Sequence, residues 1–245
     1  MDEKTFTVIT YNIDYQSPFQ EERLYQFIEQ VKEWNPDILA IQEGTKAIYS
    51  KLFLAMQNMG YSKKVDERYI KKDVSEVIFT KFPIKKLEYV PFQHTKQKRN
   101  LTLYLLDVLG QDIWVGTTQL ESGGKRTPFL NKQIKQIEKK VSKLNEAVIL
   151  TGDFQLAEYQ KNICEPPELI DAWYDAGSSE QKYSIDSKLN MNVRFRDRPD
   201  RIWYKSPRDS KEEIECIEYS LVGLPNEAPL LASNHFGVYT KFKKI

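Results

Sequence analysis

The chain has 245 residues, of which 40% are hydrophobic and 29% are charged, and its formal net charge at pH 7 is +1. This length allows a sizeable core, and the composition excludes a disordered chain. A charge near zero excludes a global basic field, so an anionic partner needs a local patch of positive charge. The sequence has no run of about 20 apolar residues, and we expect no contact with a membrane.

Strands and helices alternate at the start of the chain. The β-rich stretch F-T-V-I-T-Y-N predicts a strand over 6–12, and apolar residues at helical spacing predict a helix over 19–34. D-I-L-A-I-Q-E predicts the next strand over 37–43, and a second helix follows over about 46–59. This alternation indicates an α/β arrangement.

The middle of the chain is rich in strands. Their close spacing predicts antiparallel neighbours that are joined by short turns. The four predicted strands cover residues 77–82, 87–92, 101–108 and 113–118.

A third helix is predicted over 128–144, where apolar residues step by four, three, four and three. Pro128 suits its first turn, and Thr127 is placed to cap it. The strand A-V-I-L-T-G-D-F follows, and residues 157–200 are predicted to be irregular. The chain closes with strands over 201–205, 214–220 and 238–242.

No stretch of the chain has the composition of a linker. We therefore expect a single domain over 1–245, with two mixed β-sheets packed face to face and helices outside. Cys164 and Cys216 lack the spacing of metal ligands and are interpreted as structural thiols. They favour a reducing, intracellular location, cytoplasmic or nuclear, and the start M-D-E-K-T-F gives no reason to expect a signal peptide.

Polar residues stand at the ends of four predicted strands: Asn12, Glu43, Asp153 and the Asn234-His235 pair. Sites in α/β proteins often gather at strand ends. Each residue alone also has a structural interpretation. Glu43 is able to cap the next helix, Asp153 to hold a turn, and a lone Asn or His is more often structural than catalytic.

Six motifs follow one another in a fixed order: T-Y-N-I-D, I-Q-E-G, T-T-Q-L-E-S, T-G-D-F-Q-L, R-P-D-R-I-W-Y and S-N-H-F-G-V. The series resembles the endonuclease/exonuclease/phosphatase superfamily and covers essentially the whole chain. Within it, I-D after the first Asn, L-E-S, and the stretch from L-I-D-A-W to D-R-I-W-Y are similar to the 5′-tyrosyl-DNA phosphodiesterase branch. The resemblance implies a four-layer α/β sandwich and metal-dependent phosphodiester hydrolysis.

The resemblance also implies a role for each matching residue. Glu43 is the expected ligand of Mg²⁺, with Mn²⁺ as a substitute, because these cations prefer oxygen ligands. Asp153 matches the carboxylate that activates water, and Asn12 would hydrogen-bond the water or the phosphate. Protonated His235 would stabilise charge on the phosphoryl oxygens, and Asp200 would orient it.

Three expected catalytic positions depart from the family pattern: Gln119 replaces a His, Gln155 an Asn, and Asn234 an Asp. Losing the charge at Asn234 would cost roughly 1–4 kcal/mol of metal attraction, although its amide oxygen still allows weak metal coordination. The longer arm of Gln155 would misplace its amide, and about 1 Å can cost on the order of a hundredfold in rate. Gln119 cannot supply a proton. We expect that loss to matter least for a phenolate leaving group, since the pKa of tyrosine is about 10.

Candidate substrate-binding residues are less distinctive. Ser122 lies in L-E-S, and Lys125 and Arg126 precede a helix N-terminus that could hold a phosphate, although an exposed loop explains them as well. The basic stretch 94–100 is predicted to be a solvated hairpin. Arg196 belongs to a cluster that could line a phosphate groove or pair with Asp197 and Asp200; its other members are Arg194, Arg198 and Arg201.

Two further positions depart from the tyrosyl-DNA branch: Ala157 replaces an Arg and Ile185 a Trp, which removes a phosphate contact and a stacking surface. The leading hypothesis is a monomeric phosphodiesterase whose substrate is a nucleic acid or a protein–nucleic acid adduct. RNA–protein linkages and small phosphodiesters stay open. One alternative is a catalytically dead relative that binds nucleic acid or protein. Another is that the three amides were introduced to trap a complex.

Overall fold

The structure is a computed structural model that describes residues 4–62, 74–123, 127–157, 166–208, 212–225 and 230–245. Its longer elements, in chain order, are β1 (Thr5–Asn12), α1 (Gln20–Trp34), β2 (Ile38–Gly44), α2 (Lys46–Asn58), β3 (Ser75–Thr80), β4 (Ile84–Pro91), β5 (Asn100–Val108), β6 (Gln111–Gln119), α3 (Thr127–Val141), β7 (Ala147–Asp153), β11 (Asp200–Lys205), β12 (Ile214–Val222) and β13 (Gly237–Lys244). Four short elements lie between β7 and β11: β8 (Ile170–Asp171), α4 (Ala172–Ala176), β9 (Ile185–Asp186) and β10 (Arg196–Asp197).

The strands form two large mixed sheets. The first sheet has the order β12-β13-β1-β2-β3, and the second has the order β4-β5-β6-β7-β11-β8, while β9 and β10 pair with each other. Each large sheet has one parallel pair, β1 with β2 and β6 with β7, and its other neighbours are antiparallel. The mixed character predicted from the sequence is confirmed.

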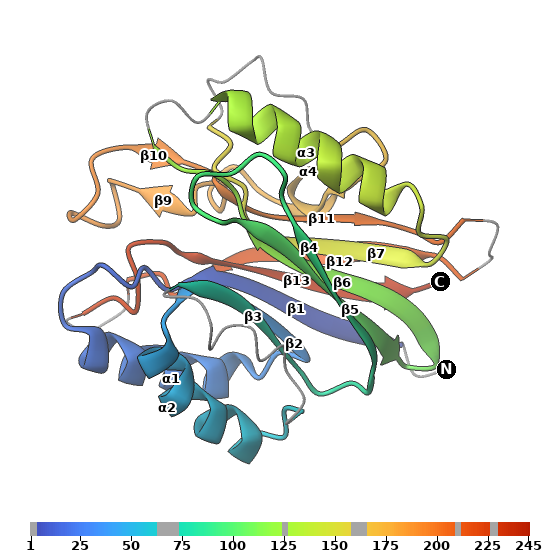
Figure 1. The fold of residues 1–245 in the computed structure, drawn as a ribbon. Coiled ribbons are helices and arrows are strands. Elements are labelled where there is room, and N and C mark those ends of the chain that lie inside the picture. Colours follow the sequence, from blue (N-terminus) through green and yellow to red (C-terminus); the bar gives the residue numbers. More distant parts are fainter. Residues whose placement is uncertain (1–3, 63–73, 124–126, 158–165, 209–211, 226–229) are drawn as a thin grey trace.

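Helices cover the outer faces of both sheets, α1 and α2 on the first and α3 on the second (Figure 1). Val8, Ile38 and Ile149 belong to a buried core that joins strands of the two sheets. Phe27 of α1 packs with the first sheet, and Ile137 of α3 packs with the second. The four-layer sandwich is therefore confirmed. Among the described residues, no helix is both long and apolar enough to cross a bilayer.

Strand pairing brings the polar strand ends to one edge of the sandwich. Each parallel pair is joined by a helical crossover, so the carboxyl ends of its strands lie together. In the second sheet, Gln119 is level with Asp153, and Asp153 is level with Asp200 at the start of antiparallel β11. In the first sheet, β13 runs antiparallel to β1, so the chain enters β13 beside Asn12.

Two sequence predictions differ from the structure. The helix expected over 128–144 is α3, which begins at Thr127 and ends at Val141, so Thr127 is its first residue and not its cap. The part of 157–200 that the structure describes is not wholly irregular, because it contains β8, α4, β9 and β10. These elements have two to five residues, too few to show a hydrophobic period.

Candidate active site

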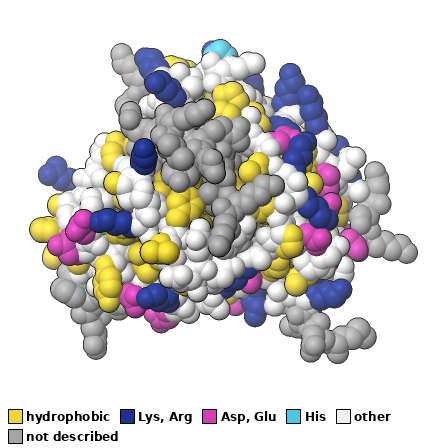
Figure 2. Space-filling view, turned by 60° about the horizontal axis from the view of Figure 1, so that its bottom comes forward, with side chains coloured by type: hydrophobic (Ala, Val, Ile, Leu, Met, Phe, Trp, Pro, Cys, Tyr) yellow, Lys and Arg dark blue, Asp and Glu magenta, His cyan; other side chains and the backbone are white. Residues whose placement is uncertain are grey.

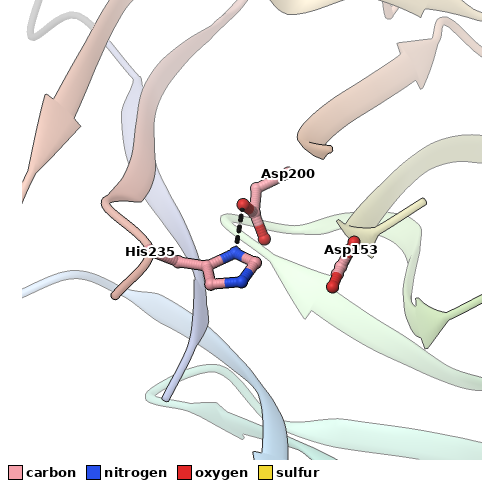
Figure 3. Close-up of side chains that lie close together, drawn as sticks. All are labelled: Asp153, Asp200 and His235. Carbon is pink, nitrogen blue, oxygen red and sulfur yellow. Dashed lines mark hydrogen bonds and ion pairs between the residues drawn. The ribbon is translucent and has the colours of Figure 1, made fainter. Parts of the chain in front are cut away.

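The polar residues meet at the edge where strand ends of both sheets come together. Asn12 ends β1, Glu43 lies near the end of β2, and Asp153 ends β7. Asp200 begins β11, and His235 stands two residues before β13. Figure 3 shows Asp200 above the imidazole ring of His235, joined to it by the dashed line, and Asp153 to the right of the ring.

His235 and Asp200 form an ion pair, in which the imidazole Nδ1 lies 2.8 Å from Asp200 Oδ2. Ser184 Oγ donates to the same carboxylate oxygen at 2.7 Å. Burial alone would lower the pKa of His235, but the charge and hydrogen bond of Asp200, with smaller contributions from Asp153 and Glu43, raise it to about 10. The imidazole is therefore protonated at neutral pH, and its Nε2–H is available as a charged donor.

Three side-chain amides hold Asp153. Its Oδ2 accepts from Asn12 Nδ2 at 3.0 Å, from Gln155 Nε2 at 2.6 Å and from Gln119 Nε2 at 3.3 Å. Its Oδ1 accepts from the backbone N–H of Gln155 at 3.1 Å. Donors of this kind fix the orientation of the Asp153 carboxylate. Gln119 and Gln155, which depart from the family pattern, both belong to this arrangement.

Glu43 is aimed into the same cleft by an irregular piece of strand. The register between β2 and β3 shifts between Ile41 and Gly44, and the φ of Glu43 is 59°. A left-handed conformation at a non-glycine residue costs roughly 1–3 kcal/mol and is concentrated at functional sites. The Glu43 carboxylate accepts a hydrogen bond from Gln119 Nε2. Burial, and then the charge of Asp153, raise the pKa of Glu43.

Gly152 explains the glycine of the T-G-D-F motif. Its φ is 143°, and a Cβ added there would lie 2.0 Å from the carbonyl oxygen of Thr118 on β6. Only glycine allows β6 and β7 to approach so closely at this point. The close approach sets Asp153 level with Gln119.

The charges of the site suit a divalent cation. Three carboxyl groups, those of Glu43, Asp153 and Asp200, gather around His235, and burial raises the pKa of Glu43 and of Asp200. Asp200 Oδ1 is buried without a partner in the described part of the chain. Ligand atoms of Asp153, Asp200 and His235 all lie within 4.8 Å of one another. A protonated imidazole has no lone pair to offer a metal, so the carboxylates are the better candidates.

Asn234 faces away from this group of carboxylates. Its Nδ2 donates to Asp14 Oδ2 and to Ser17 Oγ, both at 2.7 Å. Its amide oxygen is 3.5 Å from Asn190 Nδ2. The role of Asn234 in metal binding stays a prediction, and its observed role is to hold the loop that follows β1.

Two of the predicted substrate-binding residues, Ser122 and Arg196, lie in the described part of the chain, and each has a partner within the protein. Ser122 exchanges hydrogen bonds with Gln97, and Lys125 and Arg126 lie outside the described residues. Arg196 forms a two-bond pair with Asp186, at 2.8 Å for each bond. None of these contacts tests a role in binding substrate.

Two of the clustered arginines have a partner that the sequence did not indicate. Arg198 and Arg201 share the buried carboxylate of Asp171, at 2.7 and 3.3 Å. Ala157 and Ile185, which replace an Arg and a Trp of the family pattern, are themselves buried. Arg198 lies in the loop that leads into Asp200, so its pair with Asp171 anchors that loop to β8.

Arg99 was missed as a site residue. It donates to Gln119 Oε1, lies 4.0 Å from Glu76, and its side chain is only 12% exposed. The expectation that 94–100 is a solvated hairpin is wrong for this residue. Ser184 was also missed as the second partner of Asp200, although it lies in the Y-S-I-D stretch that carried part of the resemblance.

No family model matches the chain. Human tyrosyl-DNA phosphodiesterase 2 is 27% identical over 246 residues, which cover 95% of this chain and 67% of that protein. The rat protein is also 27% identical, over 97% of this chain and 66% of its own length. The chain thus spans about two thirds of the length of these relatives.

Solved structures share the fold. Tyrosyl-DNA phosphodiesterase 2 from D. rerio, complexed with a single-stranded DNA product, matches with a TM-score of 0.86 at 21% identity, over 98% of this chain and 99% of that one. The C. elegans enzyme matches with a TM-score of 0.83 at 23% identity, over 99% and 77% of the two chains. A mannosyl-6-phosphatase from Bacteroides thetaiotaomicron matches at 0.74 and 17% identity, over 97% and 99%.

Proposed function

We propose that the chain is a metal-dependent phosphodiesterase, because it aligns with tyrosyl-DNA phosphodiesterase 2 along nearly its whole length and shares the fold of that protein. Its substrate is a phosphodiester between a nucleic-acid 5′ end and a tyrosine side chain. The observation that carries the proposal is the pairing of a base and a charged donor. Asp153, held by amides, lies close to His235, held protonated by Asp200.

The residues divide the reaction between them. Asp153 accepts a proton from a water molecule, whose oxygen forms a new bond to phosphorus. Asn12 holds the carboxylate that receives this proton. His235 donates from Nε2 to a phosphoryl oxygen on which negative charge grows. The bond from phosphorus to the tyrosine oxygen breaks, and tyrosine leaves as a phenolate.

Glu43 is the residue that would hold the metal, with Asp153 close by. A metal held there, Mg²⁺ or Mn²⁺, would supply Lewis-acid stabilisation of the phosphoryl charge. The gathering of three carboxyl groups supports a cation here, and their oxygen donors favour Mg²⁺ over a soft metal.

The three amide positions favour a slowed enzyme over an inert binding module. Gln119 and Gln155 both donate to Asp153, so they preserve the base. Asn234 keeps its own hydrogen bonds to the loop after β1. Arg99, through Gln119, adds positive charge to a site whose leaving group departs as an anion.

The direct test is cleavage of an oligonucleotide that carries a 5′-phosphotyrosine, with release of a 5′-phosphate in Mg²⁺. We expect the native chain to cleave this substrate and the Asp153→Asn variant to lose the activity. Absence of turnover in the native chain and in Gln119→His/Gln155→Asn/Asn234→Asp would refute the proposal. Turnover only in that triple variant would instead identify the native chain as an inactive relative.

A further inference from the structure

A basic groove runs along the outer side of the second sheet, between α3 and the edge strand β4. Its volume is about 440 Å³. Five lysines line it, together with His94, and no carboxylate does; the lysines are Lys132, Lys135, Lys139, Lys140 and Lys143. The spacing of these lysines along α3 and the segment after it places them on one side of the helix.

Most of this charge is uncompensated. Lys140 bonds to Glu88, whereas Lys132, Lys135, Lys139 and Lys143 are exposed and form no ion pair within the described ranges. Glu138, the single acidic residue of α3, lines a neighbouring hollow beside residues 166–169, which Lys135 and Lys139 also border. The groove therefore concentrates positive charge in a chain whose formal net charge is only +1.

The opposite side of the molecule is organised differently. Figure 2, turned toward the α1 and α2 side, shows Lys and Arg interspersed with Asp and Glu. Two lysines of these helices are paired, Lys32 with Glu29 and Lys51 with Glu21. These two lysines differ in this respect from the exposed lysines of the groove.

The loop between β4 and β5 connects the groove to the active site. Gln133 of α3 donates to the carbonyl oxygen of His94 at 3.0 Å, and Gln136 accepts from the backbone N–H of Gln93 at 3.0 Å. The same loop ends at Arg99, which donates to Gln119 in the active site. Figure 1 shows this loop beside α3. One short segment therefore has its first half at the groove and its last residue at the catalytic cleft.

We propose that the basic groove binds the sugar–phosphate backbone of the nucleic acid whose end lies in the cleft, an inference that rests on the proposed function for what the cleft holds. From Lys132 to Lys143 the chain would advance about 16 Å in helical geometry. One strand of a duplex presents a phosphate about every 3.4 Å, so this distance spans roughly five phosphates. The lysines would position the substrate without reading its sequence, because phosphate contacts carry no base information.

The test compares two variants with equal loss of charge. The groove variant is Lys132→Gln/Lys139→Gln/Lys143→Gln, and the control variant is Lys4→Gln/Lys32→Gln/Lys51→Gln, which changes exposed lysines elsewhere. Both are made in an Asp153→Asn chain, which prevents cleavage. Binding of a labelled 5′-phosphorylated oligonucleotide, single-stranded or duplex, is measured between about 50 and 200 mM salt.

The salt dependence gives the readout. Each lost phosphate contact lowers the slope of log K against log salt by about 0.7 for a single strand and about 0.9 for a duplex. The groove variant should therefore lose about 2 or about 3 from the slope, respectively, and the control variant should keep the slope of its parent. An equal loss in both variants, or no loss in either, would overturn the proposal. So would groove-dependent binding to phosphatidylserine vesicles without binding to the oligonucleotide.

Cleavage separates this proposal from the proposed function. With Asp153 intact, the groove variant should cleave a tyrosyl phosphodiester of a single nucleotide as the native chain does, because that substrate is too short to reach the groove. It should cleave the oligonucleotide substrate with a raised KM. If no chain cleaves either substrate, the proposed function fails, while the binding slopes still decide whether the groove holds nucleic acid.

Discussion

His235 and Asp200 join the two sheets at the active site, since Asp200 begins β11 of the second sheet and His235 leads into β13 of the first. Their 2.8 Å ion pair is almost wholly buried. A buried pair of opposite charges gains from low dielectric, but removing one partner is costly. The pair therefore links the position of the imidazole to the packing of one sheet on the other.

We expect Asp200→Asn to change the pH profile. The pKa of His235 is raised to about 10, so the pair's contribution to stability is complete below the ordinary histidine pKa and is lost as the pH rises through about 10. Without Asp200, the desolvation of His235 would dominate and its pKa would fall. In a plot of kcat against pH, the fall at alkaline pH should move from near pH 10 toward neutral pH. At pH 8 this corresponds to roughly a hundredfold loss of kcat.

Ser184→Ala is the matched control for this change, because it removes a hydrogen bond to Asp200 but leaves the carboxylate charge. It should move the alkaline limb much less than Asp200→Asn does. If both variants keep the native limb, His235 is not the protonated donor.

We expect Glu43→Gln to separate stability from metal binding. The pKa of Glu43 is raised by burial and by Asp153, so the ionised carboxylate opposes folding at neutral pH in the absence of metal. The variant should unfold at a higher temperature than the native chain in EDTA. It should also lose most of the stabilisation that Mg²⁺ gives, because we expect its dissociation constant for Mg²⁺ to rise by a factor of about 10 to 1,000.

Thermal denaturation with and without Mg²⁺ measures both effects, and a ligand that binds only the folded state raises the transition in proportion to its affinity. Glu76→Gln, at a buried carboxylate beside Arg99, is the control for removing a charge near the site. Equal Mg²⁺ stabilisation of Glu43→Gln and the native chain would exclude Glu43 as a ligand.

The sequence was informative where function depends on strand ends. Asn12 and Asp153 were predicted because each follows a hydrophobic strand, and parallel strands that are joined by a helix end at the same edge. His235 was singled out by its place before the last predicted strand, whereas Asp200 was identified only through the order of motifs. The distance between them depends on how two sheets pack, which no local pattern encodes.

The sequence was uninformative where a side chain reaches its partner across a loop. Arg99 looked like one more charge of a polar hairpin, and its burial depends on Thr95, Glu121 and Gln133 anchoring that hairpin to α3. The sequence did not indicate the partner of Arg198 and Arg201 for the same reason. Asp171 lies in a two-residue strand, and only the tertiary fold brings its carboxylate within 2.7 Å of the Arg198 guanidinium.

Gln119→His is expected to change leaving-group preference. Gln119 donates to Glu43 and Asp153 and accepts from Arg99, so its amide is fully committed within the site. A histidine would add a proton donor at the expense of this bridge. Cleavage of an alkyl phosphodiester should rise by on the order of a hundredfold, and cleavage of an aryl phosphodiester should change far less. The ratio of kcat/KM for paired aryl and alkyl esters measures the effect, and equal acceleration of both would contradict it.

Asn234→Asp, which restores the family residue, is expected to destabilise this chain. The amide of Asn234 donates to Asp14 and Ser17, and an aspartate would place a second carboxylate against Asp14. We expect a loss of about 1–3 kcal/mol in the free energy of unfolding, because a half-buried donor is removed and a like charge is added. Urea denaturation in EDTA measures this loss.

The swapped pair, Asp14→Asn/Asn234→Asp, tests the cause, because it again sets an amide donor opposite a carboxylate. It should recover most of the stability that Asn234→Asp loses, and the coupling energy of this double-mutant cycle should exceed about 1 kcal/mol. Asp14→Asn alone removes the acceptor without adding charge, so it should cost less than Asn234→Asp. A swapped pair as unstable as Asn234→Asp would show that the loss arises elsewhere. The loop after β1 would then hold Asn234 for reasons other than this hydrogen bond.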